Sequence, residues 1–382
     1  MRFSHLLAAL FYWIATSVFA QQAVKLPEEI IRIPKKDGWF TFELETTVFR
    51  PPEDATDTKK PLVIINHGKA FGNPRFQSRY RPMPAVRFFL QRGYVVAVPM
   101  RTGFSNSGGN YIETGCDIKG NGNMQAEDVT AVLNYFKNDV AIDPQKILIV
   151  GQSHGGLTTL AFGARPEASL QNGVKGLVNF AGGLRQNNCL SWESVLAKAV
   201  SDYAKTTTLP SLWFYGDNDS YFSRSTWQDM FERYQNKGGK AKLIAYGTFG
   251  KDSHSLFVTQ SGETVWRDEL ISFMQSIELP TTILYPEFAA ATPLSIPPST
   301  HFAPLAAIDA VPYQKEKGRE AYAKFLQQEA PRAFAISNDG GWGWANGGDD
   351  PLRRALEFCQ AKSKAPCHLY AVDTEIVWDP SN

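Results

Sequence analysis

Residues 146–156 read KILIVGQSHGG, and this stretch decides the predicted fold class. Its first half contains a short apolar run at residues 147–150, which is typical of a strand buried on both faces of a parallel sheet. The run continues directly into the G-x-S-x-G pattern Gly151-Gln152-Ser153-His154-Gly155. The glycines allow a sharp reversal from strand to helix, which leaves the central side chain projecting at strained dihedral angles. Ser153 is therefore the candidate nucleophile, and the amides of the following helix would point at it.

The rest of the chain alternates apolar strands with helical segments. Two antiparallel strands are predicted first, at residues 30–33 and 40–49; buried strands follow at 61–66, 94–98, 176–181, 209–215 and 241–246. Helices are predicted at residues 85–92 and 124–137 and around Trp192, Trp227 and Trp266. This order predicts a doubly wound, mostly parallel α/β sheet with helices on both faces. Ligands of such sheets bind beyond the carboxyl ends of the strands, where the Gly-rich loop 99–123 is expected to cover the site.

The C-terminal part of the chain differs in character. Residues 282–312 are rich in proline and lack periodicity, so we interpret them as a linker after a catalytic domain at residues 21–281. Residues 313–382 are predicted to form a small α+β module, with helices at 318–328 and 350–360 and strands at 333–337 and 368–373. The sequence assigns this module neither an activity nor a partner.

The first twenty residues have the order of a secretory signal peptide. Arg2 is followed by an apolar run at residues 6–14 and by Ser17-Val18-Phe19-Ala20, the small residues typical of a cleavage site. We therefore expect a secreted or periplasmic protein with no stable membrane anchor after cleavage; an uncleaved anchor is the alternative. The formal net charge of +1 gives no indication of a nucleic-acid partner.

Export also bears on the four cysteines, because disulfides persist in oxidising compartments. None of them lies in a C-x-x-C motif, so no metal site is expected. Cys359 and Cys367 flank one turn and are predicted to form a local disulfide. Cys116 and Cys189 lie in loops expected on opposite sides of Ser153, so a disulfide between them would cross the rim of the site.

A serine hydroxyl needs a base to remove its proton, usually an imidazole held by a carboxylate. Of the six histidines, only His254 comes immediately after the last core strand. The others lie elsewhere: His5 is in the signal peptide, and His154 is in the G-x-S-x-G turn, which we call the elbow. His67 follows the strand at 61–66, His301 is in the linker and His368 is in the terminal module. The acid should come from YGDND at the end of an earlier strand, where we favour Asp219 and keep Asp217 as the alternative.

An acyl-transfer site also needs two preorganised amides that stabilise the oxyanion. We predict that His154, the residue after the nucleophile, supplies one. The loop after His67-Gly68 should supply the other, from Lys69, because a glycine stands where close backbone approach is required.

These motifs together resemble those of a known superfamily. The ordered set NHG, GQSHGG, YGDND and DSH resembles an α/β-hydrolase over roughly residues 30–280, and MRTGFSNSGG is similar to the dienelactone-hydrolase-like branch. The resemblance implies a Ser or Cys nucleophile with Asp and His, which fall here on Ser153, Asp219 and His254. The chain differs from dienelactone hydrolases proper in its serine, its export signal and its extra module.

We therefore predict an exported serine hydrolase that cleaves a carboxylic ester through an acyl-enzyme, without metal or organic cofactor. Arg75, Arg79 and Arg101 are hypothesised to recognise a substrate carboxylate or phosphate. Glu113 and Asp117 could instead bind an amine, as a peptidase or amidase needs. A second alternative is a non-catalytic binding protein on a hydrolase scaffold.

Overall fold

The computed structural model describes residues 26–53, 58–290, 294–328, 331–347 and 350–380. The predicted signal peptide, residues 1–20, lies outside this range. Within it, the structure contains no helix that is both long and apolar enough to cross a membrane.

The larger part of the described chain is built on an eight-stranded sheet of order β1-β2-β4-β3-β5-β6-β7-β8. Its strands are β1 (Glu28–Asp37), β2 (Phe40–Phe49), β3 (Lys60–Asn66), β4 (Val95–Pro99), β5 (Ile142–Gln152), β6 (Val174–Phe180), β7 (Ser211–Tyr215) and β8 (Ala241–Ala245). The strands from β4 to β8 run parallel, and β1 and β2 join this sheet in antiparallel pairing. The predicted sheet is confirmed, with β1 and β5 longer than the sequence indicated.

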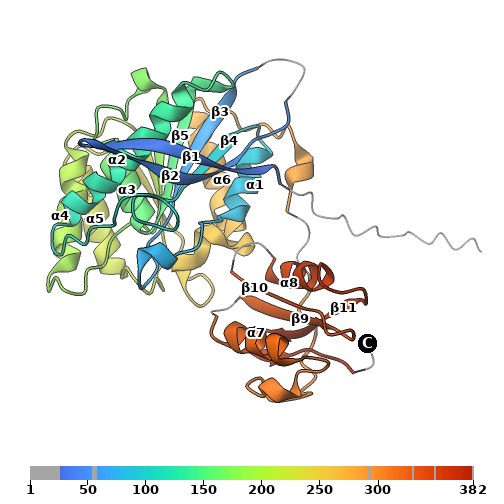
Figure 1. Ribbon diagram of the computed structural model, residues 1–382. Helices are drawn as coiled ribbons and strands as arrows, with labels where there is room; N and C mark the ends of the chain where they lie inside the picture. The colour runs from blue at the N-terminus through green and yellow to red at the C-terminus, as the bar shows by residue number, and fades with distance from the viewer. Residues whose placement is uncertain (1–25, 54–57, 291–293, 329–330, 348–349, 381–382) are drawn as a thin grey trace, which may run out of the picture.

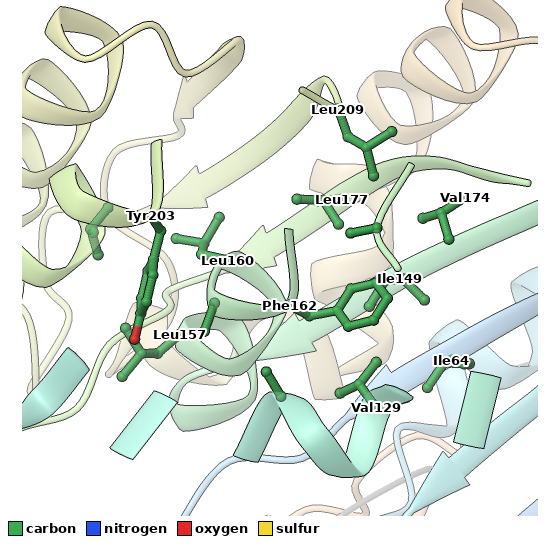
Figure 2. Close-up of a cluster of buried hydrophobic side chains, with 14 of the residues drawn as sticks. Ile64, Val129, Ile149, Leu157, Leu160, Phe162, Val174, Leu177, Tyr203 and Leu209 are labelled. Carbon is green, nitrogen blue, oxygen red and sulfur yellow. The ribbon is translucent and has the colours of Figure 1, made fainter. Parts of the chain in front are cut away.

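Helices cover both faces of this sheet (Figure 1). One face packs against α1 (Met83–Leu90) and α6 (Gln260–Ser276); the other packs against α2 (Ile118–Lys137), α3 (His154–Gly163), α4 (Trp192–Ala204) and α5 (Arg224–Asn236). Figure 2 shows part of the second core, where Leu157, Leu160 and Phe162 of α3 lie among apolar side chains of the sheet and of the neighbouring helices. Two buried cores on opposite faces make this the doubly wound fold that the alternation predicts.

Helix α2 begins earlier than predicted, at Ile118 rather than Met124. Its N-cap is Asp117, whose carboxylate accepts a hydrogen bond from the amide of Gly120 at 2.8 Å. The sequence did not predict a helix from Ile118 because its first two turns contain two glycines and two asparagines, which are poor helix formers. The loop over the site therefore ends at Asp117.

The C-terminal module has its own four-stranded antiparallel sheet within the described residues, of order β10-β9-β11-β12. The elements are α7 (Glu316–Leu326), β9 (Arg332–Ser337), β10 (Trp342–Asn346), α8 (Pro351–Gln360), β11 (Cys367–Val372) and β12 (Glu375–Ile376). The sequence predicted α7, β9, α8 and β11 but not the short strands β10 and β12. A glycine within β10 weakened the strand pattern, yet it is required there: a Cβ on Gly343 would lie 2.3 Å from the amide nitrogen of Cys359 in α8.

The proline-rich segment 282–312 packs at both of its ends. Leu284 and Tyr285 donate backbone hydrogen bonds to the carbonyl oxygen of Gln91 after α1, and Phe288 is buried in the core on that face. At the other end, Val311 is buried in the core of the module.

Candidate active site

Ser153 stands between β5 and α3 with φ 56° and ψ −125°, a backbone conformation that side chains other than glycine rarely adopt. Both flanking glycines are required by close packing. A Cβ on Gly151 would lie 2.1 Å from the carbonyl oxygen of Gly155, and a Cβ on Gly155 would lie 2.1 Å from that of Asn66. The local sequence thus forces the sharp turn, and Ser153 lines a cavity at the carboxyl edge of the sheet.

His254 and Asp219 meet at the same edge. The Nδ1 atom of His254 lies 2.9 Å from Oδ2 and 3.1 Å from Oδ1 of Asp219. The Asp219 side chain is fully buried, and its Oδ1 also accepts hydrogen bonds from the amides of Tyr221 and Phe222. Because the carboxylate fixes Nδ1, Nε2 is the nitrogen that remains for proton transfer. His254 lines the same cavity as Ser153.

The other two acids near this pair have different partners. The carboxylate of Asp217 lies 3.6 Å from Nη1 of Arg224. Asp252 caps the short helix η3 (Ser253–Val258): its carboxylate accepts hydrogen bonds from the amides of His254 and Ser220. The structure therefore brings Asp219, and not Asp217, against His254, while Asp252 ties the two loops together.

The predicted oxyanion amides border Ser153 from two elements. His154 is the first residue of α3, where the leading N–H groups of a helix have no partner within it. On the other side, a Cβ on Gly68 would lie only 3.1 Å from Cβ of Ser153, and the adjoining Lys69 lines the cavity. Gln77 holds this loop by donating to the carbonyl oxygen of Gly68 at 3.0 Å and accepting from the amide of Ala70 at 2.9 Å.

Two buried histidines near Ser153 bond to Arg101, His67 to its backbone amide and His154 to its guanidinium group. The amide of Arg101 donates to Nε2 of His67, and its Nη2 donates to Nδ1 of His154 at 3.1 Å. The opposite nitrogens are therefore the protonated ones: Nδ1 of His67 donates to Gly68, and Nε2 of His154 donates to Asn121. Burial, reinforced by the neighbouring guanidinium, holds the pKa of both histidines well below the usual range.

The three arginines predicted to recognise an anion occupy different environments. Arg101 is completely buried and does not line the cavity. Burial lowers its pKa to about 10, so the guanidinium group is still charged at neutral pH. Arg75 donates to the carbonyl oxygens of Ser107 and Gly109 and so fixes the loop. Only Arg79 of the three lines the cavity among the described residues, where it bonds Glu28 and Thr47. The sequence could not separate a loop-supporting arginine from a cavity-lining one, because both follow strands.

Both predicted disulfides are present. Cys116 and Cys189 connect the loop before α2 to the loop before α4, across 73 positions in the sequence. Those loops contribute Glu113 and Gln186 to a small cavity of about 60 Å³ that also borders Ser153. The disulfide between Cys116 and Cys189 therefore links two loops at the rim beside Ser153.

The sequence missed two residues that shape this site. The ring of Tyr221 lies 4.4 Å from that of His254 and stacks on that of Phe71 at 5.7 Å, and Tyr221 lines both the small cavity and a larger one of about 1290 Å³. Gln152 accepts a hydrogen bond from Tyr80 and donates one to the backbone carbonyl of His254 at 2.8 Å. The sequence offered one signal for them, which is their proximity to predicted site residues: Tyr221 follows Asp219 by two positions, and Gln152 directly precedes Ser153.

Comparison with known proteins gives one family match. Residues 83–168, which run from α1 past α3 and include the elbow, match the model of the prolyl oligopeptidase family. A search of curated proteins found no match to this chain.

A search of solved structures gives matches at low sequence identity, of which three are described. An esterase of Pyrococcus furiosus is 15% identical, with 71% of this chain and 96% of the esterase covered and a TM-score of 0.49. A Klebsiella pneumoniae protein provisionally assigned as a dienelactone hydrolase is 16% identical, with coverages of 66% and 100% and a TM-score of 0.46. The protein Est1E of Butyrivibrio proteoclasticus, solved with ferulic acid, is 19% identical, with coverages of 65% and 99% and a TM-score of 0.47.

Proposed function

We propose that this α/β-hydrolase is an exported serine hydrolase that cleaves a carboxylic ester through an acyl-enzyme. One observation carries the proposal: a fully buried carboxylate, Asp219, holds Nδ1 of His254 beside a cavity into which the strained turn presents Ser153. A turn this strained persists only where the surrounding structure enforces it, and such strain is concentrated at functional sites.

In the proposed first step, Oγ of Ser153 attacks the ester carbonyl while Nε2 of His254 removes its proton. The imidazolium that forms is stabilised by Asp219, which also keeps Nε2 directed toward the reaction. The proton then passes to the departing alcohol, and a water molecule, activated by the same histidine, releases the acid from Ser153.

The carbonyl oxygen becomes an anion in the tetrahedral intermediate. We assign its stabilisation to the backbone amides of His154 and Lys69, which belong to the start of α3 and to the loop after Gly68. The loop is supported by Gln77, so the second amide is preorganised rather than recruited on binding.

A peptidase or amidase with the same triad is the second candidate, and the match to the prolyl oligopeptidase family favours it. Two acids were expected to bind an amine in that case. The Glu113 carboxylate lies 3.4 Å from Nζ of Lys69, and that of Asp117 caps α2, so both already have partners. We therefore rank an ester above an amide.

Export is part of the proposal and is supported by the two disulfides. Secretion or a periplasmic location would keep both oxidised. Detection of the processed chain outside the cytoplasm, beginning at Gln21, would test it.

The activity is tested with nitrophenyl esters of graded acyl length, aminoacyl nitroanilides and a fluorophosphonate probe. Ester turnover together with labelling of Ser153 is the expected result. Faster turnover of the nitroanilides would favour the peptidase. If folded protein neither turned over any substrate nor bound the probe, a non-catalytic binding protein would be the better reading.

A further inference from the structure

The larger cavity beside Ser153 has walls from both parts of the chain. Residues near α1 form one wall, including Arg79 and Arg81. The other wall comes from the C-terminal module, where Arg353, Arg354 and Glu357 of α8 line the same cavity. Figure 1 shows α8 on the side of the module that is nearest the catalytic domain.

Positive charge is concentrated in this cavity. The described residues that line it include six cationic side chains, Lys69, Arg79, Arg81, Arg87, Arg353 and Arg354, against three acidic ones, Glu28, Asp350 and Glu357. The whole chain of 382 residues has a formal net charge of only +1. The surplus of cations is therefore local to the site and not a property of the surface in general.

The arrangement of these charges leaves capacity for an anion. Arg79 and Arg81 share one carboxylate, that of Glu28, to which both donate hydrogen bonds. Glu28 is partly buried; this burial would raise the pKa of its carboxyl, but the two guanidinium groups more than compensate and keep it low. Two cations that neutralise a single anion retain one positive charge between them, and guanidinium groups bind carboxylates in a matched planar geometry.

The cavity also has an apolar surface beside the charges. Phe358 of α8 is 46% exposed and Ile30 of β1 is 50% exposed, and both line the cavity together with Leu26. A volume of about 1290 Å³ exceeds what a short acyl chain occupies. The site thus fits a long ester that carries an apolar body and a negative charge remote from the scissile bond.

We propose that the C-terminal module completes the active site, and that α8 together with Arg79 and Arg81 selects elongated esters whose far end carries a carboxylate. This inference rests on the proposed esterase activity for its kinetic test. It gives the module a role in substrate specificity, with Arg354 as the binding residue; Arg353 pairs with Asp350 at 3.1 Å at the start of α8.

The kinetic test compares mono-nitrophenyl esters of dicarboxylic acids with nitrophenyl alkanoates of equal length. The ratio of kcat/KM, anionic over neutral, should rise with chain length in the wild type. Arg354→Gln should lower this ratio about fivefold, the amount expected for a partly exposed ion pair, and added salt should reduce the preference. Glu357→Gln removes a negative charge from the same wall and should raise the ratio.

Arg319→Gln is the matched control, because Arg319 lies on α7 of the same module and pairs with Asp309 without lining the cavity. Its ratio should equal that of the wild type. A ratio that Arg354→Gln and Glu357→Gln leave unchanged would overturn the proposal.

A binding measurement separates this proposal from the proposed chemistry. In the Ser153→Ala protein, monomethyl octanedioate, which carries one carboxylate, should bind more tightly than the uncharged methyl octanoate by calorimetry, and Arg354→Gln should reduce the difference. Equal affinities would refute the anion site even in an active esterase. Conversely, a chain that hydrolyses no ester but retains the difference would refute the esterase and leave the anion site standing.

Discussion

The imidazole of His254 lies with Nδ1 2.9 Å from Oδ2 of Asp219, although 35 residues separate the two in the sequence. This pairing discriminates between two aspartates that stand only two positions apart. Asp217 has side-chain exposure of 36% and faces Arg224, whereas the side chain of Asp219 has no exposure. Solvent would weaken an electrostatic interaction between Asp217 and the imidazole of His254. The buried carboxylate of Asp219 is shielded from solvent and can fix the tautomer of that imidazole.

The first prediction concerns this choice of acid. Asp219→Asn should reduce kcat by about 10²- to 10⁴-fold, because the amide favours the wrong tautomer of His254. Asp217→Asn, the matched control, should change kcat less than about threefold. Steady-state ester hydrolysis measures both, with Ser153→Ala as the inactive reference; a larger loss in Asp217→Asn would contradict the assignment.

The second prediction concerns Gly68, which closely approaches Ser153. In Gly68→Ala the new Cβ would lie 3.1 Å from Cβ and 3.6 Å from Oγ of Ser153, in the space beside the proposed oxyanion amides. We expect kcat/KM to fall by about 10²- to 10³-fold, as when one oxyanion donor is removed. The melting temperature should change little, so a variant that is fully active, or one that merely unfolds, would argue against a functional role for this close approach.

Arg101 and Arg79 should behave differently, although both were first considered as anion-binding residues. Arg101→Gln removes the donor to Nδ1 of His154, and each buried acceptor left without a partner costs about 1–3 kcal/mol. It should therefore lower the melting temperature without changing the preference between anionic and neutral esters. Arg79 lines the cavity, so Arg79→Gln should shift that preference. If Arg101→Gln shifted the preference and Arg79→Gln did not, Arg101 would again be a candidate for substrate binding.

The disulfide at the rim gives a prediction on both stability and activity. Replacing Cys116 and Cys189 by serine should cost about 4 kcal/mol in the chain-entropy model, because the bond closes a loop across 73 positions. Hydrolysis should change at temperatures below the melting of the core, because the bond joins two loops at the small cavity. The Cys359–Cys367 pair, which closes a loop across only 8 positions, is the control: its loss should cost about 2.5 kcal/mol and leave the kinetics of neutral esters unchanged.

Stability should fall in mild acid because of the buried histidines. The pKa of His67 and His154 is held well below the ordinary value of 6.5, so these groups contribute stability that is fully present above pH 6.5. That stability is lost as the pH falls from 6.5 toward their lowered pKa, because the unfolded chain binds the protons more readily. Each histidine contributes up to about 1.4 kcal/mol per pH unit.

The measurement is chemical denaturation between pH 7 and pH 5, above the range in which most carboxylates titrate. The exposed His301 supplies the control, since His301→Gln should retain the full pH dependence. A free energy of unfolding that stayed constant over this interval would mean that one or both buried histidines are protonated in the native state.

The sequence by itself determined the doubly wound sheet, the strained turn at Ser153 and both disulfide pairings. Each can be read from sequence patterns: apolar runs predict the strands, the glycine pattern around Ser153 predicts the sharp turn, and the order of strands brings the cysteine-bearing loops to one edge. The same order put His254 after the last strand of the sheet.

Tertiary structure alone decided what each polar side chain contacts. Arg75, Arg79 and Arg101 read alike in the sequence, yet one supports a loop, one lines the cavity and one is buried between histidines. The wall that α8 contributes to the cavity depends on how the C-terminal module packs beside the larger sheet. The spacing of apolar residues within either part of the sequence does not predict that arrangement. Side-chain burial and hydrogen bonding arise from contacts between distant segments, so they follow only once the chain has folded.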